Sequence, residues 1–542
     1  AAPPWAGMGN KTFSSSSEAV VQRAEQRVGK LPASGRYHRS PRQLQDDYDV
    51  GDKMLGEGCS GKVFLALCRQ TGAKFAVKTL HVRNISADSR QLIENEVELF
   101  LSMDHPRVAR LNAVYECDGD LRLVMECMEG GELFDRLVER ETFSEVDAAD
   151  AAWQMLLALN YIHGHGIVHR DVKMENFMYA RKDTDHLKLI DFGLSKVWDP
   201  NTQMKACCGT LSYIAPEVLR KSYTSQCDLW SLGVIVYALL VGSMPFDGSH
   251  SHQMSAIMAG IYDLESEDWK RVSADARDFV RQLLQVDPAQ RLTAERALEH
   301  VWIQSRDQAR SSNLVVDSRV VDALRKFARG SKFRRACMSV MAWHLTHEER
   351  KSLVDGFLAM DKTRRGTIRL CELRDVLEQQ FNVKDQEVVD IFKALDASHD
   401  DEIHYSEFLA AMVSSRITLH ESLLWGAFQR FDADRSGFIT SDDLRLVLGE
   451  SFEGAKVGEI IAEVDQGRIG KVSYGDFVDY LRRGGDVEGE HARAANQIID
   501  AELGKLKAGG GGGAVAGGSS PLHPLGMSDS SLGFDGDSER RV

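Results

Sequence analysis

Five short motifs occur in a fixed order in the first half of the chain, and together they constrain its fold more than any other feature. A Gly-x-Gly-x-x-Gly-x-Val run fills residues 56–63, and an Ala-Val-Lys triplet ends at Lys78. His-Arg-Asp ends at Asp171, Asp-Phe-Gly begins at Asp191, and Ala-Pro-Glu begins at Ala215. The glycine run alone is a weak signal, because dinucleotide-binding folds and plain hairpins also use it. The full set in this order predicts one fold that brings the motifs to a single site.

The first two motifs predict a phosphate-binding loop. Glycines let a β-turn press its main chain against phosphate groups, and a lysine on the following strand can reach them. The predicted loop residues are Leu55, Gly56, Glu57, Gly58, Cys59, Ser60, Gly61, Lys62 and Val63. A helical segment then offers a carboxylate to hold Lys78. Glu96 is preferred because it lies ten residues before Pro106, and Glu94 and Glu98 are rivals on the same segment.

The ordered motifs resemble those of the eukaryotic protein kinases over about 255 residues. The resemblance implies that Asp171 orients a substrate hydroxyl and accepts its proton, and that Lys173, a Ser/Thr-kinase feature, contacts the transferred phosphate. Asn176 and Asp191 would hold Mg²⁺, which prefers oxygen ligands. Met174 stands where the family usually has proline, which leaves the functional groups intact. The residues implied for ATP, besides the glycine loop, are Ala76, Lys78, Met125, Glu126, Met128 and Asp191.

Two further carboxylates predict the substrate class. Glu132 resembles the residue that pairs with a substrate arginine in calmodulin-dependent kinases, and Glu175 can add a second carboxylate. We therefore expect protein substrates with a basic residue N-terminal to the phosphorylated Ser or Thr. No Ser, Thr or Tyr lies within residues 203–208, so activation by phosphate there looks unnecessary, although Thr202 remains a candidate. Regulation is then expected from elsewhere in the chain.

Four 12-residue windows repeat in the second half of the chain, with spacings of 35, 36 and 33 residues. Apolar helical patterns flank every window, and each has an apolar residue at its eighth position, which can pair two loops through a short β bridge. These residues are Ile368, Ile403, Ile439 and Val472. Such a repeat is EF-hand-like, and four hands form two paired lobes resembling calmodulin. The windows are residues 361–372, 396–407, 432–443 and 465–476.

The windows differ in their possible calcium ligands. An EF loop needs oxygens at positions 1, 3, 5 and 12, a carbonyl at 7 and a tight turn at 6. The third window offers Asp432, Asp434, Ser436, the Phe438 carbonyl and Asp443. The second offers Asp396, Ser398, Asp400, the Glu402 carbonyl and Glu407. We expect both to bind Ca²⁺. In the second window the turn position holds Asp401, which tolerates left-handed geometry, and in the third the short arm of Asp443 predicts weaker Ca²⁺/Mg²⁺ discrimination.

The first and fourth windows lack ligands. The first has Asp361, Thr363 and Glu372, but its fifth position is Arg365, whose cation would oppose a metal ion. The fourth has glycine and isoleucine at its third and fifth positions, Gly467 and Ile469. We expect both loops to fold as structural partners without metal.

A basic junction, residues 303–345, separates the two blocks. Residues 319–345 contain seven Lys or Arg and one Asp among apolar residues, whereas residues 346–483 contain 27 Asp or Glu against 18 Lys or Arg. The junction is calmodulin-target-like, and we expect the acidic module to bind it. A kinase, a basic junction and four EF hands in this order resemble the calcium-dependent protein kinases. The resemblance implies a Ca²⁺-activated Ser/Thr kinase, released from intramolecular autoinhibition when Ca²⁺ binds.

The expected fold class is α+β: a bilobal protein kinase fold over residues 48–302, followed by an all-α calmodulin-like module over residues 346–483. Residues 1–47 are predicted to be a flexible leader, and residues 484–542 a short helix followed by a flexible Gly/Ser-rich tail. Gly9 would become an N-terminal glycine if the preceding methionine were the start. Lipidation of Gly9 would then allow peripheral membrane association.

Composition limits the remaining functions. The formal net charge is −15 and the pI is about 5.6, which argues against a nucleic-acid-binding protein. Nine scattered cysteines without a Cys-x-x-Cys pair predict a reducing, cytoplasmic location. One alternative is a Ca²⁺-responsive scaffold with a vestigial kinase fold, although Lys78, Asp171 and Asp191 are all present. Another is a kinase whose EF hands are structural and filled with Mg²⁺.

Overall fold

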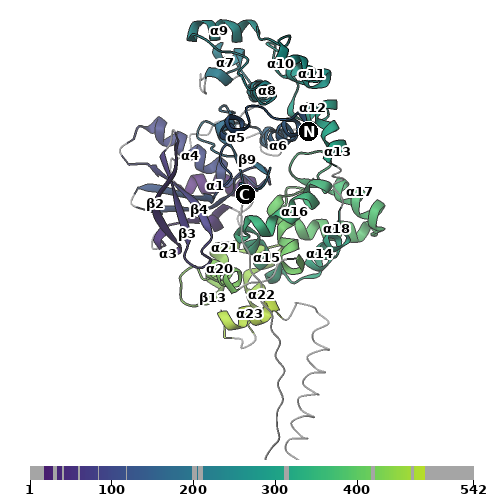
Figure 1. Ribbon diagram of the computed structural model, residues 1–542. Helices are drawn as coiled ribbons and strands as arrows, with labels where there is room; N and C mark the ends of the chain where they lie inside the picture. The colour runs from purple at the N-terminus through teal and green to yellow at the C-terminus, as the bar shows by residue number, and fades with distance from the viewer. Residues whose placement is uncertain are drawn as a thin grey trace, which may run out of the picture. The chain divides into compact units, whose positions relative to one another are not determined.

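The computed structural model describes residues 17–28, 33–39, 42–58, 61–83, 85–117, 119–197, 204, 211–310, 316–416, 421–465 and 469–482. All of them belong to the first of two compact units, residues 1–485. A mixed strand-rich lobe comes first, a helical lobe follows, and helix–loop–helix units end the described chain (Figure 1). The α+β class expected from the sequence is confirmed.

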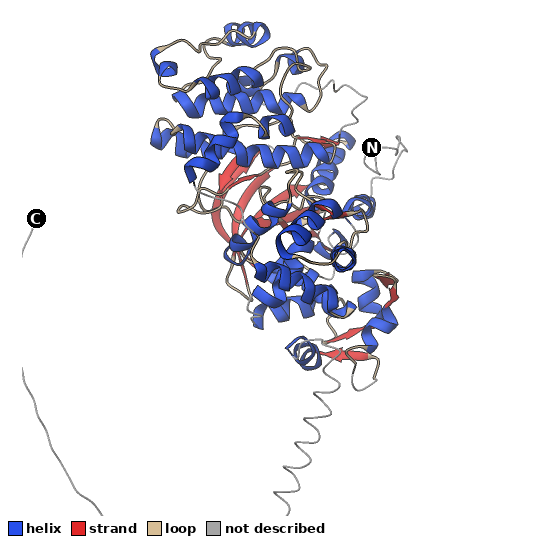
Figure 2. Cartoon of the chain, turned by 90° about the vertical axis from the view of Figure 1, so that its right-hand side faces the viewer, coloured by secondary structure: helices blue, strands red, loops and turns tan. Residues whose placement is uncertain are grey.

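A six-stranded sheet forms the N-terminal lobe, and Figure 2 draws its strands side by side in red. Their order across the sheet is β1-β5-β6-β4-β3-β2. The strands are β1 (Tyr37–His38), β2 (Tyr48–Gly58), β3 (Gly61–Cys68), β4 (Lys74–His81), β5 (Leu111–Cys117) and β6 (Asp120–Glu126). Alternate side chains enter different cores: Val114 and Leu123 join the main core, whereas Val77, Tyr115 and Val124 join a small cluster on the other face. Helix α4 (Ala87–Leu101) begins at the capping side chain of Ser86.

The helical lobe is built around two strongly apolar helices, α6 and α8, which pack on each other. Its helices are α5 (Leu133–Arg140), α6 (Glu145–Gly164), η2 (Met174–Asn176), η3 (Leu211–Tyr213), α7 (Pro216–Leu219), α8 (Gln226–Val241), α9 (His250–Ala259), α10 (Glu267–Lys270), α11 (Ala274–Leu283), α12 (Ala294–Leu298) and α13 (Val301–Arg310). Its short strands are β7 (Ile167–Val168), β8 (Phe177–Tyr179), β9 (Leu187–Leu189) and β10 (Lys196–Val197), paired as β8–β9 and β10–β7.

The predicted flexible leader is wrong for the part of residues 1–47 that the structure describes. Residues 17–28 form helix α1 (Ser17–Val28), which packs on α4, and β1 pairs in parallel with β5. The helix forms because Val20, Val21 and Ala24 lie on one buried face. On α1, Arg23 and Arg27 both pair with Glu98. The remaining structured pieces are η1 (Ser34–Arg36) and α3 (Leu44–Asp47).

The basic part of the junction, residues 319–345, forms two helices rather than one continuous helix. They are α14 (Ser318–Arg329) and α15 (Lys332–His344). The break occurs at Gly330, and the Ser331 side chain then caps the second helix. The large apolar side chains that alternate with the basic residues of this stretch are buried: Val320, Val321, Leu324, Phe327, Phe333, Met338, Val340, Met341 and Leu345. These helices pack against α18, α19 and α20 of the following module, so the expected association of junction and module is present.

The EF-hand module, here residues 346–482, contains four helix–loop–helix units. Its helices are α16 (His347–Met360), α17 (Leu370–Phe381), α18 (Asp385–Leu395), α19 (Tyr405–Arg416), α20 (Glu421–Phe431), α21 (Ser441–Leu448), α22 (Val457–Ala462) and α23 (Tyr474–Arg482). Its strands are β11 (Ile368–Arg369), β12 (Glu402–Ile403), β13 (Phe438–Thr440), β14 (Ser451–Phe452), β15 (Ala455–Lys456) and β16 (Lys471–Ser473). The predicted β bridges are confirmed, because Ile368 lies opposite Ile403 and Ile439 opposite Val472.

The junction and the EF-hand module contact the leader and the N-terminal lobe at several buried points. The Arg110 guanidinium donates to the Ala342 carbonyl at 2.8 Å. The guanidinium groups of Arg36 and Arg110 both lie over the Trp343 ring, 3.9 and 4.0 Å from its centroid. The main-chain N–H of Ser406, at the start of α19, donates to the Asp104 carboxylate at 2.8 Å. These contacts join the leader, the N-terminal lobe and the module.

Candidate active site and calcium loops

The glycine loop is a hairpin between β2 and β3. Gly58 lies opposite Gly61, and Gly56 lies opposite Val63. Gly61 has φ of +146°, and a side chain there would meet the Thr79 carbonyl oxygen at 2.5 Å, so this position requires glycine. The predicted Leu55, Glu57 and Lys62 lie on the same two strands, whereas Cys59 and Ser60 fall outside the described residues.

Lys78 joins three elements through its ammonium group. The Nζ atom lies 2.6 Å from Glu96 Oε1 on α4 and 3.1 Å from Asp191 Oδ1. Burial disfavours the ammonium, but the two carboxylates outweigh burial and raise the pKa of Lys78. The predicted partner Glu96 is therefore the one in contact, and its rival Glu98 pairs with α1 instead. Phe192, next to Asp191, is buried 5.4 Å from the ring of Phe100 on α4.

The predicted catalytic loop places three polar side chains together. The Asp171 carboxylate lies 2.8 Å from Lys173 Nζ and accepts a hydrogen bond from Asn176 Nδ2 at 3.1 Å. Asn176 Nδ2 also donates to the Asp171 carbonyl at 2.7 Å. Main-chain N–H of Ile190 donates to the Asn176 carbonyl at 2.9 Å, which links this loop to the segment before Asp191. The oxygen-bearing pair Asn176 and Asp191 suits the predicted Mg²⁺ role.

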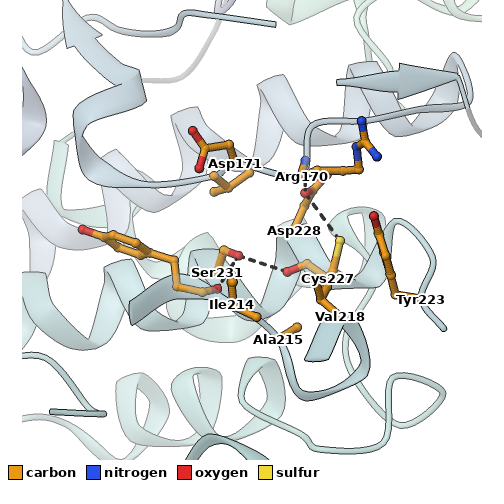
Figure 3. Close-up of a pocket in the computed structure, with 11 residues that line it drawn as sticks. Arg170, Asp171, Ile214, Ala215, Val218, Tyr223, Cys227, Asp228 and Ser231 are labelled. Atoms are coloured by element: carbon orange, nitrogen blue, oxygen red, sulfur yellow. Dashed lines mark hydrogen bonds between the residues drawn. The ribbon is translucent and has the colours of Figure 1, made fainter. Parts of the chain in front are cut away.

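Asp228, which the sequence analysis did not identify, supports this loop from below (Figure 3). Its carboxylate accepts hydrogen bonds from the main-chain N–H groups of His169 and Arg170, each at 2.9 Å, and lies 2.8 Å from His163 Nε2. Burial alone would raise the pKa of Asp228, but His163 and His169 hold it below its usual value. Arg170 adopts φ of +68°, and these hydrogen bonds fix that turn. An acidic residue in the first turn of the otherwise mostly apolar helix α8 was the available sequence signal.

The predicted adenine-binding hinge follows β6. Met125 lies opposite Ala76 across the sheet, and Met128 lies two residues beyond the end of β6. The Glu126 main-chain N–H donates to the Arg110 carbonyl at 2.9 Å. Its side chain has partners that the sequence did not predict, the cations of Lys188 and Arg350.

The third EF loop gathers carboxylates as predicted. Oxygens of Asp432, Asp434 and Asp443 lie within 4.8 Å of one another. The Ser436 hydroxyl is 3.2 Å from the Phe438 carbonyl oxygen, so the remaining two predicted ligands point to the same place. Gly437, at the turn, has φ of +82°. Burial raises the pKa of Asp432, with a further contribution from Asp434, which a bound cation would reverse.

The second EF loop brings its predicted ligands into one small network. The Ser398 hydroxyl lies 3.0 Å from Asp400 Oδ1 and 3.3 Å from Asp396 Oδ1. Burial, with Asp400 and Asp396 nearby, raises the pKa of Glu407 to about 8. Buried carboxylates of like charge are the donor set that Ca²⁺ would stabilise. Asp401 has φ of +64°, the left-handed turn expected of it, and Glu402 follows at the start of β12.

The first and fourth loops differ from these. In the first, Asp361 is fully buried and accepts main-chain N–H groups of Arg365 and Gly366 at 3.0 and 2.8 Å. The Arg365 guanidinium points to Glu295, 3.8 Å away, rather than into the loop. The side chain of Arg365, at position 5 of the loop, therefore supplies no oxygen ligand. In the fourth loop Ile469 is 64% exposed, and Gly467 falls outside the described residues.

The first loop instead lies against the catalytic lobes. The Asn160 side chain donates to the Arg364 carbonyl at 2.7 Å. Gly366, with φ of +82°, approaches so closely that a side chain there would meet the rings of His105 and Tyr161 at 2.5 Å. These two rings stack on each other with centroids 4.8 Å apart. This loop therefore serves as a contact surface.

Protein-family models and known proteins match most of this chain. A protein kinase domain matches residues 49–303, and an EF-hand domain pair matches residues 350–413. The chain is 36% identical over 453 residues to calcium-dependent protein kinase 34 of Arabidopsis thaliana, a match that covers 82% of this chain and 86% of that protein. It is also 36% identical over 457 residues to calcium-dependent protein kinase 9 of Oryza sativa subsp. japonica, which covers 83% and 79% of the two chains. Within the described part, no helix is long and apolar enough to cross a membrane.

Proposed function

The chain belongs to the calcium-dependent protein kinase family, and from this premise we propose which of its residues transfer phosphate and which sense Ca²⁺. The activity is that of a Ca²⁺-regulated protein serine/threonine kinase that uses ATP and Mg²⁺. The observation that supports the proposed catalytic set best is the placement of Lys78 between Glu96 and Asp191, because it brings the sheet, α4 and the Asp-Phe-Gly segment together.

Phosphoryl transfer requires positioning and charge neutralisation more than covalent chemistry. The main chain of the β2–β3 hairpin and Lys78 hold the phosphates of ATP, while the hinge receives adenine. Asp191 and Asn176 hold Mg²⁺, which when bound neutralises charge on the phosphate oxygens. Asp171 orients the substrate hydroxyl and accepts its proton, and Lys173 contacts the transferred phosphate.

The substrates are proposed to carry a basic residue N-terminal to the phosphorylated Ser or Thr. Glu132 caps the start of α5, and burial, Asp135 and Glu175 together raise the pKa of Glu132. Glu175 Oε2 is buried and has no hydrogen-bond partner among the described residues. A substrate arginine would satisfy both carboxylates. A peptide with arginine at the position N-terminal to the phosphorylated residue should have a lower KM than the same peptide with alanine there. Glu132→Gln should reduce the difference. Equal KM values for the two peptides would exclude this preference.

The Ca²⁺ switch is proposed to use the second and third EF loops, one in each pair of hands. In the structure, the junction helices α14 and α15 pack on helices α18, α19 and α20 of the module. We propose that this association is the released state, and that without Ca²⁺ the junction and module hold the kinase inactive. The high effective concentration of partners in one chain favours the capture.

A kinase assay across a free-Ca²⁺ titration tests the switch. The unmodified protein should gain activity at roughly 10⁻⁷–10⁻⁵ M Ca²⁺. The double variant Asp396→Ala/Asp432→Ala should lose this response, whereas Asp375→Ala/Asp442→Ala, at exposed carboxylates outside the loops' ligand positions, should keep it. A double variant at Asp396 and Asp432 with an unchanged Ca²⁺ response would contradict the proposal.

Peripheral membrane association in the cytoplasm is proposed through lipidation of Gly9, a residue outside the described part of the chain. One acyl chain gives only weak, reversible binding. Mass spectrometry of the N-terminus, together with vesicle flotation of the Gly9→Ala variant, tests this. An unmodified Gly9 in the cell-derived protein would rule it out.

A further inference from the structure

The carboxylate of hinge residue Glu126 binds cations from two other parts of the chain. It accepts hydrogen bonds from Lys188 Nζ at 2.7 and 2.9 Å and from an Arg350 guanidinium nitrogen at 2.9 Å. Lys188 lies on β9 of the helical lobe, whereas Arg350 lies on α16, the first helix of the EF-hand module. All three side chains are buried. The hinge, the helical lobe and the module therefore meet at one ionised side chain.

Arg350 affects the pKa values of both Glu126 and Lys188. Burial alone would raise the pKa of Glu126, but Arg350 and Lys188 hold it well below its usual range. Burial lowers the pKa of Lys188 to about 8, with Glu126 opposing and Arg350 adding to that change. His347, also on α16, lies 3.6 Å from the Glu126 carboxylate. Within the N-terminal and helical lobes this carboxylate is bonded by Lys188 and by the main-chain N–H of Arg110, and the module adds the guanidinium of Arg350.

The main chain of Glu126 is also linked to the junction, through Arg110. Its N–H donates to the Arg110 carbonyl, and the guanidinium of Arg110 donates to the carbonyl of Ala342 at the end of α15. Arg350 is itself held, because its Nε donates to the Leu345 carbonyl at 3.2 Å. Both the side chain and the main-chain partner of Glu126 are therefore in direct contact with the junction and module.

We propose that Arg350 is a positioning residue for ATP: it holds the hinge main chain in the adenine-binding geometry through Glu126, and only when the module is docked. This inference rests on the proposed role of residues 125–128 as the adenine hinge. When the module leaves, Glu126 keeps Lys188 and loses Arg350. The expected consequence is weaker ATP binding, separate from any effect on access of the protein substrate.

Linkage adds a second consequence. If docking of the module tightens ATP binding, then ATP must favour docking by the same factor. Because Ca²⁺ also favours docking, a non-hydrolysable ATP analogue should raise the apparent Ca²⁺ affinity of the full chain. This shift should depend on Arg350.

The test compares full-length variants at saturating Ca²⁺. Arg350→Gln should raise KM for ATP about tenfold, with kcat and KM for the peptide changed less than twofold. Arg350→Lys keeps a cation within reach of Glu126 and should recover most of the loss. The control is Arg374→Gln, which removes a more exposed arginine of the module whose partner, Asp385 Oδ1 at 2.8 Å, also lies within the module. In calorimetry, the ATP analogue should shift the Ca²⁺ midpoint of the unmodified protein and of Arg374→Gln, but not of Arg350→Gln.

The outcomes separate this inference from the proposed function. If the activity of the unmodified protein does not change with Ca²⁺, the proposed Ca²⁺ switch is wrong. A Ca²⁺-activated protein in which Arg350→Gln leaves KM for ATP unchanged, or lowers kcat alone, would overturn the role of Arg350. If Arg350→Gln alone does not fold, Glu126→Gln and Glu126→Gln/Arg350→Gln decide, because the double variant leaves no uncompensated carboxylate at this point. With the carboxylate gone, the second substitution should no longer change KM for ATP, and a further rise would also overturn the inference.

Discussion

Asp171 is the residue on which the proposed proton transfer depends, and its neighbours hold it in place. Lys173 and Asn176 contact its carboxylate, and Asp228 fixes the main chain just before it through two N–H groups. A charged and oriented carboxylate is what a catalytic base requires. The supporting residue, Asp228, is almost completely buried, so its charge is offset by hydrogen bonds rather than by water.

Replacing Asp171 by Asn should lower kcat about 10²–10⁴-fold, because the amide cannot accept the hydroxyl proton. ATP binding, measured with a fluorescent analogue, should change little. The matched control is Asp183→Asn, an exposed carboxylate on the loop before β9, which should keep full activity. A loss of ATP binding as large as the loss of turnover would mean that Asp171 acts in nucleotide binding instead.

At the scale of elements, each EF loop is joined to its partner by a short β bridge. The bridge Ile439–Val472 ties the third loop to the fourth, and Ile368–Ile403 ties the second to the first. Each pair thus combines one loop with a full set of oxygens and one without. Since the first loop contacts α6 through Asn160, ion binding at the second loop has a short path to the catalytic lobes.

The twelfth position of the third loop offers a direct test of ion selectivity. Asp443→Glu should raise Ca²⁺ affinity on the order of tenfold, or about 1.4 kcal/mol, because the longer arm can bind the ion through both oxygens. Mg²⁺ affinity should rise less, since that ion demands a smaller octahedral site. Calorimetry with Ca²⁺ in the presence of Mg²⁺ measures both. Asp442→Glu, at the exposed neighbouring residue, should leave both affinities unchanged.

For the whole molecule, the contact between module and catalytic lobes includes an uncharged buried histidine. Burial, and then Arg107, hold the pKa of His105 well below its usual value. His105 stays neutral in the folded protein while the unfolded chain takes up a proton below about pH 6.5. Its contribution to stability is therefore fully present above that pH, and is lost as the pH falls further, by about 1.4 kcal/mol per pH unit.

His105→Phe should flatten this acid dependence. The phenyl ring can keep the stacking on Tyr161 but cannot take a proton. Denaturant unfolding at pH 7.5, 6.5 and 5.5 should show a smaller loss of stability for the variant than for the unmodified protein. His81→Phe, at an exposed histidine, serves as the control. Identical slopes for His105→Phe and the unmodified protein would show that His105 does not drive the effect.

Much of the site was predictable because its chemistry fixes both residue type and spacing. Lys78, Asp171, Asn176 and Asp191 belong to motifs that can be read directly, and the second and third EF windows hold their oxygen ligands at the same positions of a 12-residue loop. The docking of the module was not predictable, because partners such as Glu126 and Arg350 lie 224 residues apart and follow no local pattern. The leader was misjudged because its few apolar residues, such as Val20 and Val21, form a helix only where α4 covers them.

The stacking of Arg36 and Arg110 on Trp343 has a practical consequence for anyone who truncates this enzyme. A fragment cut at the limits of the kinase match, residues 49–303, would lack both Arg36 and Trp343. It would also leave Arg110 and Glu126 without their partners Ala342 and Arg350. Kinetic constants and inhibitor affinities measured on such a fragment would therefore belong to a kinase without these contacts, not to the intact chain.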